Sequence, residues 1–268
     1  MTDSIISIRD LTVSFGGRQV LNGITLDVQR GEVIALLGAS GSGKSTMLRH
    51  IIGLVAPDSG TIHVNGVNIN HCSASALKEV RRKLGVAFQG SALFGSMSVA
   101  DNIRLPLREL TTLSEPVIEI MTYIKLASVG LGEAGNLFPR ELSGGMKKRA
   151  AVARATALDP EILVFDEPSA GLDPIVAAGL DELILFLKRA FRMTVVIVTH
   201  EMASAFRVAD RIAMLYEGSL IAVLDKDRFI ASTDPRIRQF LDRRPIHVAD
   251  SETVQRRLRE LAGITGSN

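Results

Sequence analysis

The chain has 268 residues, which is enough for one large globular domain with a sizeable core, or for one core and a small lobe. Its formal net charge of +2 is too small and too evenly spread to favour a nucleic-acid-binding protein, and its single cysteine, Cys72, excludes an internal disulfide. The N-terminus lacks the basic-then-apolar pattern of a signal peptide, and no apolar run approaches the roughly 18 residues of a membrane span, so we expect a chain that is soluble by itself.

Short strands are predicted on both sides of a glycine-rich loop in the first part of the chain. Residues 5–8 and the alternating residues 24–28 have the composition of strands. Val33–Leu37 is a continuous apolar run, which is typical of a strand buried on both faces. The glycine-rich loop follows this run and leads into a predicted helix over 44–52, and residues 61–66 predict a further hairpin.

The pattern becomes helical between about residues 90 and 155, where we expect an inserted helical lobe. Proline and glycine disfavour the interior of a helix, so they predict where the helices break. The expected breaks are at Pro106, Pro116, Gly130, Gly132 and Pro139.

The chain then returns to alternating strands and helices. Residues 161–165 and Thr194–Val198 predict buried strands, and the helix between them is expected to run to about residue 191. Asp173 and Pro174 mark its start, with aspartate as the N-cap and proline in the first helical position. This order predicts a parallel sheet with crossover helices.

The domain is complete by about residue 233, and residues 234–268 form a C-terminal extension. A helix is predicted over residues 250–263, because Val254, Leu258 and Leu261 fall on one face and arginines on the other.

The glycine-rich loop matches the phosphate-binding pattern GxxxxGK[ST] in full. Its glycines allow backbone N–H groups to curl around a phosphate, and the helix that follows directs its positive N-terminus at the same anion. Lys44 would contact the β- and γ-phosphates, the Ser45 hydroxyl would ligate Mg²⁺, and Thr46 would reach the α-phosphate. The loop residues are Gly38, Ala39, Ser40, Gly41, Ser42, Gly43, Lys44, Ser45 and Thr46.

Polar side chains follow several predicted strands at the carboxyl edge of the sheet, where open parallel sheets bind ligands. Asp166 would orient the Mg²⁺ shell, and Glu167 would polarise the attacking water. The amide of Gln89 can touch Mg²⁺ or that water, and His200 is placed to contact the γ-phosphate. Alone, Asp166 and Glu167 could equally be solvated carboxylates, and Gln89 and His200 would more often be an exposed polar residue and a structural histidine. Beside the loop, the catalytic interpretation is favoured.

Phe15 precedes the loop by about 23 residues and could stack on adenine, or pack within its own strand. A second motif, Leu142-Ser143-Gly144-Gly145-Met146, is a Ser-Gly-Gly turn directly before a basic helix.

In combination, these residues resemble the ATP-binding subunit of ABC transporters over roughly residues 5–230. The resemblance implies an α/β fold: a RecA-like P-loop core over about 1–89 and 155–233, an antiparallel β-subdomain, and an inserted α-helical subdomain over about 90–154. It makes Phe15 the A-loop aromatic, Gln89 the Q-loop and His200 the switch histidine. It makes 38–46 the Walker A loop, 142–146 the signature, 162–167 Walker B and 169–173 the D-loop.

The same resemblance implies ATP and Mg²⁺ as cofactors and a homodimer that closes head to tail. Ser143, Gly144 and Gly145 of one copy would then face the γ-phosphate held by the other copy, and Asp173 would lie at the same interface. Met146 stands where the family usually has glutamine, and Phe15 where it usually has tyrosine. Neither departure removes a group that hydrolysis needs.

A closer resemblance is to the ATPases of Mla-type (MCE-associated) phospholipid transport systems of Gram-negative envelopes. It is carried by residues 88–94, by Pro106-Leu107-Arg108-Glu109, by the signature and by residues 234–241. It implies phospholipid trafficking between inner and outer membrane that maintains outer-membrane lipid asymmetry, with the ATPase peripheral at the cytoplasmic face of the inner membrane. The implied partners are a multi-spanning permease (MlaE-like), an MCE-domain protein (MlaD-like) and a small STAS-domain protein (MlaB-like).

Three alternatives stay open at this point. The cargo could be a different small molecule. An ABC ATPase acting on DNA or ribosomes is disfavoured, because only about 120 residues separate Lys44 from Asp166 and no strongly basic surface is evident. A regulatory subunit without activity is disfavoured because every catalytic position is filled.

Overall fold

The computed structural model describes residues 4–243 of the chain, which divides into two units, residues 1–229 and 230–268. Every strand of the described part lies in the first unit. The second unit contains helix α9, Pro235–Leu241, which begins with Asp234 as N-cap. The Asp234 carboxylate accepts a hydrogen bond from the backbone N–H of Arg236 at 2.8 Å, and the Arg236 guanidinium lowers the pKa of Asp234 to about 2. The helix predicted over 250–263 lies outside the described residues.

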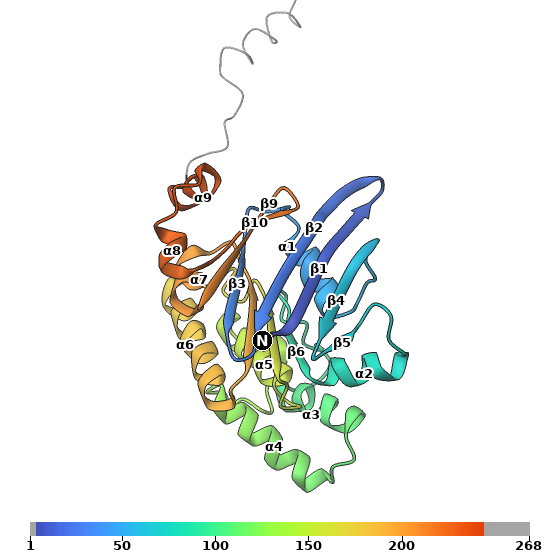
Figure 1. The fold of residues 1–268 in the computed structure, drawn as a ribbon. Helices are drawn as coiled ribbons and strands as arrows, with labels where there is room; N and C mark the ends of the chain where they lie inside the picture. The colour runs from blue at the N-terminus through green and yellow to red at the C-terminus, as the bar shows by residue number, and fades with distance from the viewer. Residues whose placement is uncertain (1–3, 244–268) are drawn as a thin grey trace, which may run out of the picture. The chain divides into compact units, whose positions relative to one another are not determined.

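A six-stranded sheet lies at the centre of the first unit (Figure 1). Its strand order is β10-β9-β3-β8-β7-β6. Strands β9, β3, β8, β7 and β6 are parallel, and β10 pairs antiparallel with β9 at one edge. The predicted parallel sheet is therefore confirmed. The strands are β3 (Val33–Leu37), β6 (Leu84–Ala87), β7 (Ile162–Asp166), β8 (Thr194–Val198), β9 (Arg211–Tyr216) and β10 (Ser219–Asp225).

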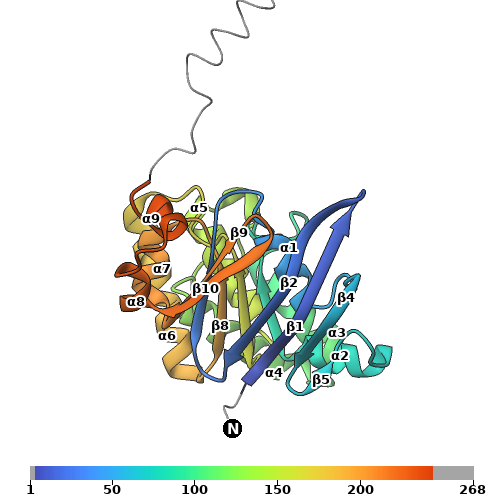
Figure 2. The same cartoon turned by 45° about the horizontal axis from the view of Figure 1, so that its top comes forward.

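The second sheet is antiparallel, in the order β2-β1-β4-β5. Helix α1 (Lys44–Ile51) lies between the two sheets and contacts both. The two sheets also meet along one side, where β2 runs beside β10 and the Asn22 N–H donates to the carbonyl of Gly218 at 2.8 Å (Figure 2). The strands of this sheet are β1 (Ser4–Phe15), β2 (Arg18–Gln29), β4 (Ser59–Val64) and β5 (Val67–Asn68).

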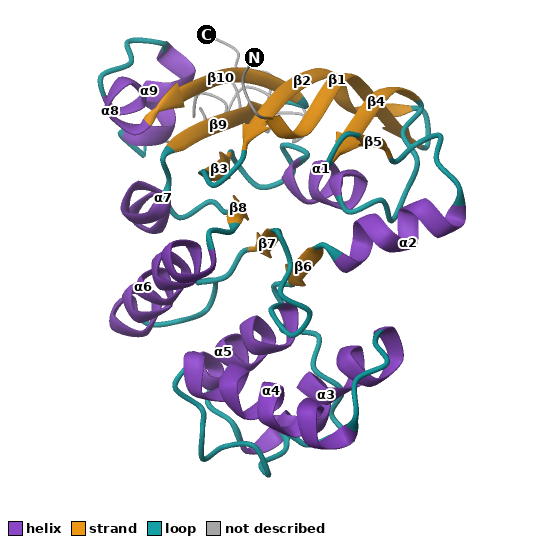
Figure 3. Ribbon diagram, turned by 60° about the horizontal axis from the view of Figure 1, so that its bottom comes forward, coloured by secondary structure: helices purple, strands orange, loops and turns teal. Residues whose placement is uncertain are grey.

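Successive residues of the central strands enter two different hydrophobic cores, which is why these strands are continuously apolar. In β7, Val164 belongs to the core beneath the antiparallel sheet, whereas Leu163 and Phe165 belong to the core on the helical side. In β8, Val196 and Ile197 divide in the same way. Helices α6 (Pro174–Phe191) and α7 (Met202–Val208) lie on the helical side of the sheet (Figure 3).

Helices α3, α4 and α5 form the lobe inserted between β6 and β7 (Figure 3). The break predicted at Pro106 is wrong, because this proline lies inside α3. The buried side of α3 docks against the core, which outweighs the one backbone hydrogen bond that proline removes. Pro116 instead starts a helix and Gly130 ends one with φ of +72°. The elements are α3 (Val99–Leu110), α4 (Glu115–Ser128), the short 3₁₀ helix η1 (Pro139–Glu141) and α5 (Gly144–Ala155).

Several elements within residues 4–243 have no counterpart in the sequence prediction. Helix α2 (Ala74–Arg82) precedes β6, α7 follows His200, and β9 and β10 form the hairpin at the sheet edge. Helix α8 (Lys226–Ile230) follows β10 and ends at the boundary of the two units. The aspartate N-cap and first-position proline predicted for α6 are confirmed, since Asp173 accepts hydrogen bonds from the N–H groups of Ile175 and Val176.

Gly85 in β6 fixes how closely the lobe approaches the sheet. A Cβ at this position would lie 2.2 Å from the backbone oxygen of Ala155, the last residue of α5. We therefore expect Gly85→Ala to lower the free energy of unfolding by about 1–3 kcal/mol, as overpacking does, measured by urea denaturation. Gly132→Ala is the matched control, because a Cβ there meets nothing within 4 Å. Equal stability of the two variants would contradict this packing.

Candidate nucleotide-binding site

Most of the predicted site residues follow four parallel strands that end at the same edge of the sheet. The phosphate-binding loop follows β3, Asp166 ends β7 and Glu167 comes next, His200 comes soon after β8, and Gln89 soon after β6. Because these strands are parallel and adjacent, their carboxyl ends share one edge, where open sheets of this kind bind ligands.

The loop is closed tightly against the protein on its inner side. A Cβ on Gly38 would lie 2.3 Å from the backbone oxygen of Leu215, and one on Gly43 would lie 2.6 Å from the Leu21 side chain. Gly43 also has φ of +105° and is the N-cap of α1. The glycines therefore allow a backbone curl that larger residues would block, with the first turn of α1 directed at its centre.

Lys44 holds this curl in shape. Its Nζ donates hydrogen bonds to the carbonyls of Gly38 at 2.8 Å and Ala39 at 3.0 Å. Burial lowers the pKa of Lys44, while the nearby Glu167 and Asp166 carboxylates oppose that shift. A buried ammonium group inside a ring of backbone amides fits an anionic phosphate chain.

Ser45 and Asp166 lie together beside the loop. The Ser45 hydroxyl donates to Oδ1 of Asp166 at 3.4 Å. Burial raises the pKa of Asp166, and the hydrogen bond from Ser45 opposes this shift. In residues 4–243 no group of three or more His, Cys, Asp or Glu side chains could hold a metal alone. One hydroxyl and one carboxylate fit Mg²⁺ that takes its other ligands from phosphate and water.

Glu167 is the most constrained of the predicted residues. Its side chain is nearly buried and its Oε2 lies 2.9 Å from Nδ1 of His200. Its backbone has φ of +50°, a conformation that non-glycine residues rarely adopt, and its N–H donates to the Val198 carbonyl at 2.8 Å. The geometry thus aims one carboxylate at the edge of the sheet and pairs it with one imidazole.

Lys148, on the second turn of α5, was not predicted as a site residue. Its Nζ donates to the carbonyl of Gln89 at 2.6 Å and to that of Glu167 at 3.2 Å. Burial lowers the pKa of Lys148, opposed by Asp166, Glu167 and Glu201. The basic run after the Ser-Gly-Gly turn was the only signal in the sequence, and it does not tell which cation faces inward.

The remaining predicted residues lie elsewhere in the first unit. Phe15 ends β1 of the antiparallel sheet and is 53% exposed. Ser143 is the N-cap of α5 and accepts from the Met146 N–H at 3.3 Å, and Asp173 is the N-cap of α6. In the part of the chain that the structure describes, no hydrogen bond or ion pair joins Phe15, Ser143 or Asp173 to the loop.

The start of α5 packs closely on the start of α6. A Cβ on Gly145 would lie 2.6 Å from Cγ1 of Val176, and one on Gly144 would lie 3.6 Å from the Leu172 side chain. A larger residue at Gly145 would therefore collide with Val176 of the same chain, whereas the distance at Gly144 is an ordinary van der Waals contact.

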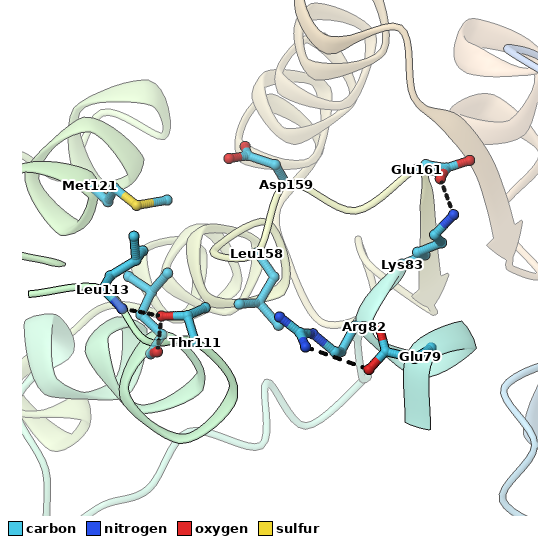
Figure 4. Close-up of a pocket in the computed structure, with 10 residues that line it drawn as sticks. Glu79, Arg82, Lys83, Thr111, Leu113, Met121, Leu158, Asp159 and Glu161 are labelled. Atoms are coloured by element: carbon cyan, nitrogen blue, oxygen red, sulfur yellow. Dashed lines mark hydrogen bonds and ion pairs between the residues drawn. The ribbon is translucent and has the colours of Figure 1, made fainter. Parts of the chain in front are cut away.

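A pocket of about 400 Å³ lies at the opposite edge of the sheet (Figure 4). Lys83 and Glu161 in its wall come just before β6 and β7, and they form an ion pair of 2.9 Å. Together with Arg30, Lys83 lowers the pKa of Glu161. The residues that line the pocket are Glu79, Arg82, Lys83, Leu107, Thr111, Leu113, Met121, Leu158, Asp159 and Glu161. This pocket is therefore separate from the edge that carries the phosphate-binding loop.

The sequence profile of the family described as "ABC transporter" matches residues 21–170. The intermembrane phospholipid transport system ATP-binding protein MlaF of Escherichia coli (strain K12) is 43% identical over 89% of this chain and 89% of its own. MlaF of Haemophilus influenzae is 39% identical over 90% of this chain and 91% of its own. The probable ribonucleotide transport ATP-binding protein mkl of Mycobacterium leprae is 44% identical over 90% of this chain and 70% of its own.

Solved structures show the same architecture. The ATP-binding cassette MJ0796, in a dimeric post-hydrolysis state bound to ADP and Pi, has a TM-score of 0.76 and 29% identity, over 82% of this chain and 98% of its own. The protein cbiO1 from Clostridium perfringens, part of the ABC transporter complex cbiONQ, has a TM-score of 0.79 and 28% identity, over 90% of this chain and 96% of its own. These structures confirm the predicted fold class.

Proposed function

The chain belongs to the ABC transporter family as an ATP-hydrolysing cassette, and from this premise we propose that it energises a complex that moves phospholipid between the inner and outer membranes. In this role it would help to maintain the lipid asymmetry of an outer membrane.

The proposal that phospholipid is the cargo rests on the match to MlaF, which is 43% identical over 89% of both chains. The mkl proteins are similarly identical, at 44%, but 30% of the Mycobacterium leprae relative lies outside the match. The name of these relatives supports the second candidate, an ATPase that energises transport of a small molecule such as a ribonucleotide.

At the chemical step, the loop and Lys44 hold the triphosphate, and Ser45, Asp166 and Gln89 hold Mg²⁺. Bound Mg²⁺ would neutralise charge that develops on the phosphate oxygens. Glu167 accepts a proton from the attacking water, and its partner His200 orients that carboxylate and contacts the γ-phosphate. The 2.9 Å contact between Glu167 and His200, and the strained backbone of Glu167, support this assignment.

ABC cassettes work as dimers, and this chain would do so head to tail. Ser143, Gly144 and Gly145 of one copy would then complete the phosphate site of the other copy. The N-terminus of α5, capped by Ser143, offers free backbone N–H groups for that contact. Asp173 would lie at the same interface, and Phe15, with its exposed ring, would stack on adenine.

The segment from Gln89 to Arg108 would contact the permease and transmit to it the movement of the closing dimer. Phe94 in this segment is 49% exposed, and Arg108 forms a two-pronged pair with Glu115 at 2.9 and 2.7 Å. An exposed aromatic ring and a charge pair within one segment fit contact with a loop of a membrane protein. We assign the remaining partners by the likeness to MlaF: an MCE-domain protein, and a small STAS-domain protein that the C-terminal extension would contact.

The proposed location is the cytoplasmic face of the inner membrane, peripheral to it and attached through the permease. Within residues 4–243, no helix is both long and apolar enough to cross a bilayer.

Purifying the tagged full chain from its native membranes and identifying co-purified proteins by mass spectrometry tests this function. We expect a permease, an MCE-domain protein and a STAS-domain protein in stoichiometric amounts. A permease with a soluble nucleotide-binding partner would favour the second candidate. Recovery with ribosomes or DNA would refute both.

A further inference from the structure

We propose that Lys148 is a positioning residue that couples the two ATP sites of the dimer. It does so by tying the signature helix of each chain to the catalytic glutamate of the same chain. The inference deepens the proposed function and rests on it, because it requires the head-to-tail dimer.

Helix α5 carries the signature at its N-terminus and Lys148 on its second turn. Its N-cap, Ser143, opens the signature, which in a head-to-tail dimer meets the nucleotide held by the other copy. Lys148 lies five residues further along the same helix, about 7.5 Å along its axis. A helix of this length moves as a rigid rod, so a displacement of the signature displaces Lys148 as well.

Lys148 connects this rod to the chain's own ATP site. Its Nζ reaches the carbonyls of Gln89 and Glu167, at 2.6 and 3.2 Å, which follow two neighbouring strands. Both acceptors are backbone groups of residues assigned to catalysis. A shift of α5 must therefore either carry these two carbonyls along or break the hydrogen bonds.

The carbonyl of Glu167 is a sensitive place for such a link. The residue already has φ of +50°, and its carboxylate is held by His200. The Glu167 N–H donates to the Val198 carbonyl at 2.8 Å and its carbonyl also accepts from the Ala170 N–H at 3.3 Å, so Lys148 shares in fixing this backbone. A rotation of the backbone would re-aim the carboxylate. Lys148 thus connects the nucleotide of one site, through the signature, to the general base of the other.

A second cation on α5 separates this role from simple anchoring. Arg154 donates to the carbonyls of Ala92 at 2.7 Å and Ser91 at 3.2 Å, both in the segment after Gln89. It therefore anchors the same segment, and within residues 4–243 no hydrogen bond or ion pair joins it to Glu167. Of the two cations, Lys148 is the one that bridges the segment and the glutamate.

The test measures ATP hydrolysis by the purified transporter complex over a range of MgATP concentrations. We compare wild type with Lys148→Met, Lys148→Arg and Lys147→Met. Lys147 is the matched control, because it is the neighbouring lysine on α5 and its side chain makes no hydrogen bond or ion pair within residues 4–243. MgATP binding to each isolated chain is measured in parallel.

We expect Lys148→Met to lower the Hill coefficient to about 1 and kcat by about tenfold, with ATP affinity unchanged within about twofold. Lys148→Arg keeps a cation with several donors, so it should retain cooperativity. Lys147→Met should behave as wild type. If Lys148→Met does not fold, Lys148→Gln replaces it, since its amide can reach one carbonyl but carries no charge.

Three results would overturn the coupling. These are a wild-type Hill coefficient in Lys148→Met, an equal loss in Lys147→Met, or a lower kcat with unchanged cooperativity, which would make Lys148 a local support only. A wild-type complex that does not hydrolyse ATP would instead refute the proposed function. The two failures are therefore distinguishable.

Discussion

Replacing Glu167 by glutamine is expected to lower the rate of ATP hydrolysis by about a thousandfold while leaving ATP binding intact. Glutamine keeps the size of the side chain and a hydrogen bond to His200, but it cannot accept a proton from water. A positioned general base contributes about 10² to 10⁴ in rate, so the loss should fall within that range. Release of phosphate and binding of MgATP are measured on the same preparation.

Glu201→Gln is the control for this experiment. Glu201 follows His200 at the same sheet edge and interacts electrostatically with Lys148, yet it is not assigned to the reaction. We expect its activity to stay within about threefold of wild type. A Glu167→Gln enzyme that hydrolyses ATP at the wild-type rate would refute the assignment of Glu167 as the base.

Replacing Lys44 by alanine is expected to weaken MgATP binding by about 10- to 100-fold, and hydrolysis with it. Hydrogen bonds to a charged group contribute about 1.5–3 kcal/mol, and this ammonium group is the cation that the loop encloses. The loss of the bonds from Nζ to Gly38 and Ala39 also frees the loop. Isothermal titration calorimetry with MgATP measures the change in affinity.

Lys78→Ala removes an equal charge from an exposed position on α2 and should leave affinity unchanged. If Lys44→Ala bound MgATP as tightly as Lys78→Ala, the loop would not be the phosphate site. The contrast between Lys44→Ala and Glu167→Gln is also informative, because one is expected to lose binding and the other only chemistry.

The sequence predicted the parts of the fold in which local chemistry determines structure. Val33–Leu37 and Thr194–Val198 are strands with the predicted bounds, because burial on both faces demands continuous apolar residues. The start of α6 could also be predicted, because Asp173 accepts hydrogen bonds from N–H groups of the first turn and Pro174 has the backbone conformation of a first helical residue. The loop at 38–46 could be predicted for the same reason, because its glycines at fixed spacing are required by its backbone conformation.

Tertiary contacts decided what the sequence did not reveal. Pro106 breaks no helix, because the core holds α3 on both sides of it. The edge hairpin of β9 and β10 was missed, since its register depends on pairing with β3. Lys148 looks like its neighbours Lys147 and Arg149 in the sequence, and only the fold brings it to the carbonyls of two distant strands.

Transfer of phospholipid in proteoliposomes tests the central claim most directly. The complex purified with the wild-type chain is reconstituted, and the ATP-dependent movement of a fluorescent phospholipid is followed. The complex with Glu167→Gln is measured in parallel. We predict transfer that requires MgATP and stops with Glu167→Gln. Equal transfer by both complexes, or ATP-dependent uptake of a ribonucleotide with no movement of lipid, would contradict the account.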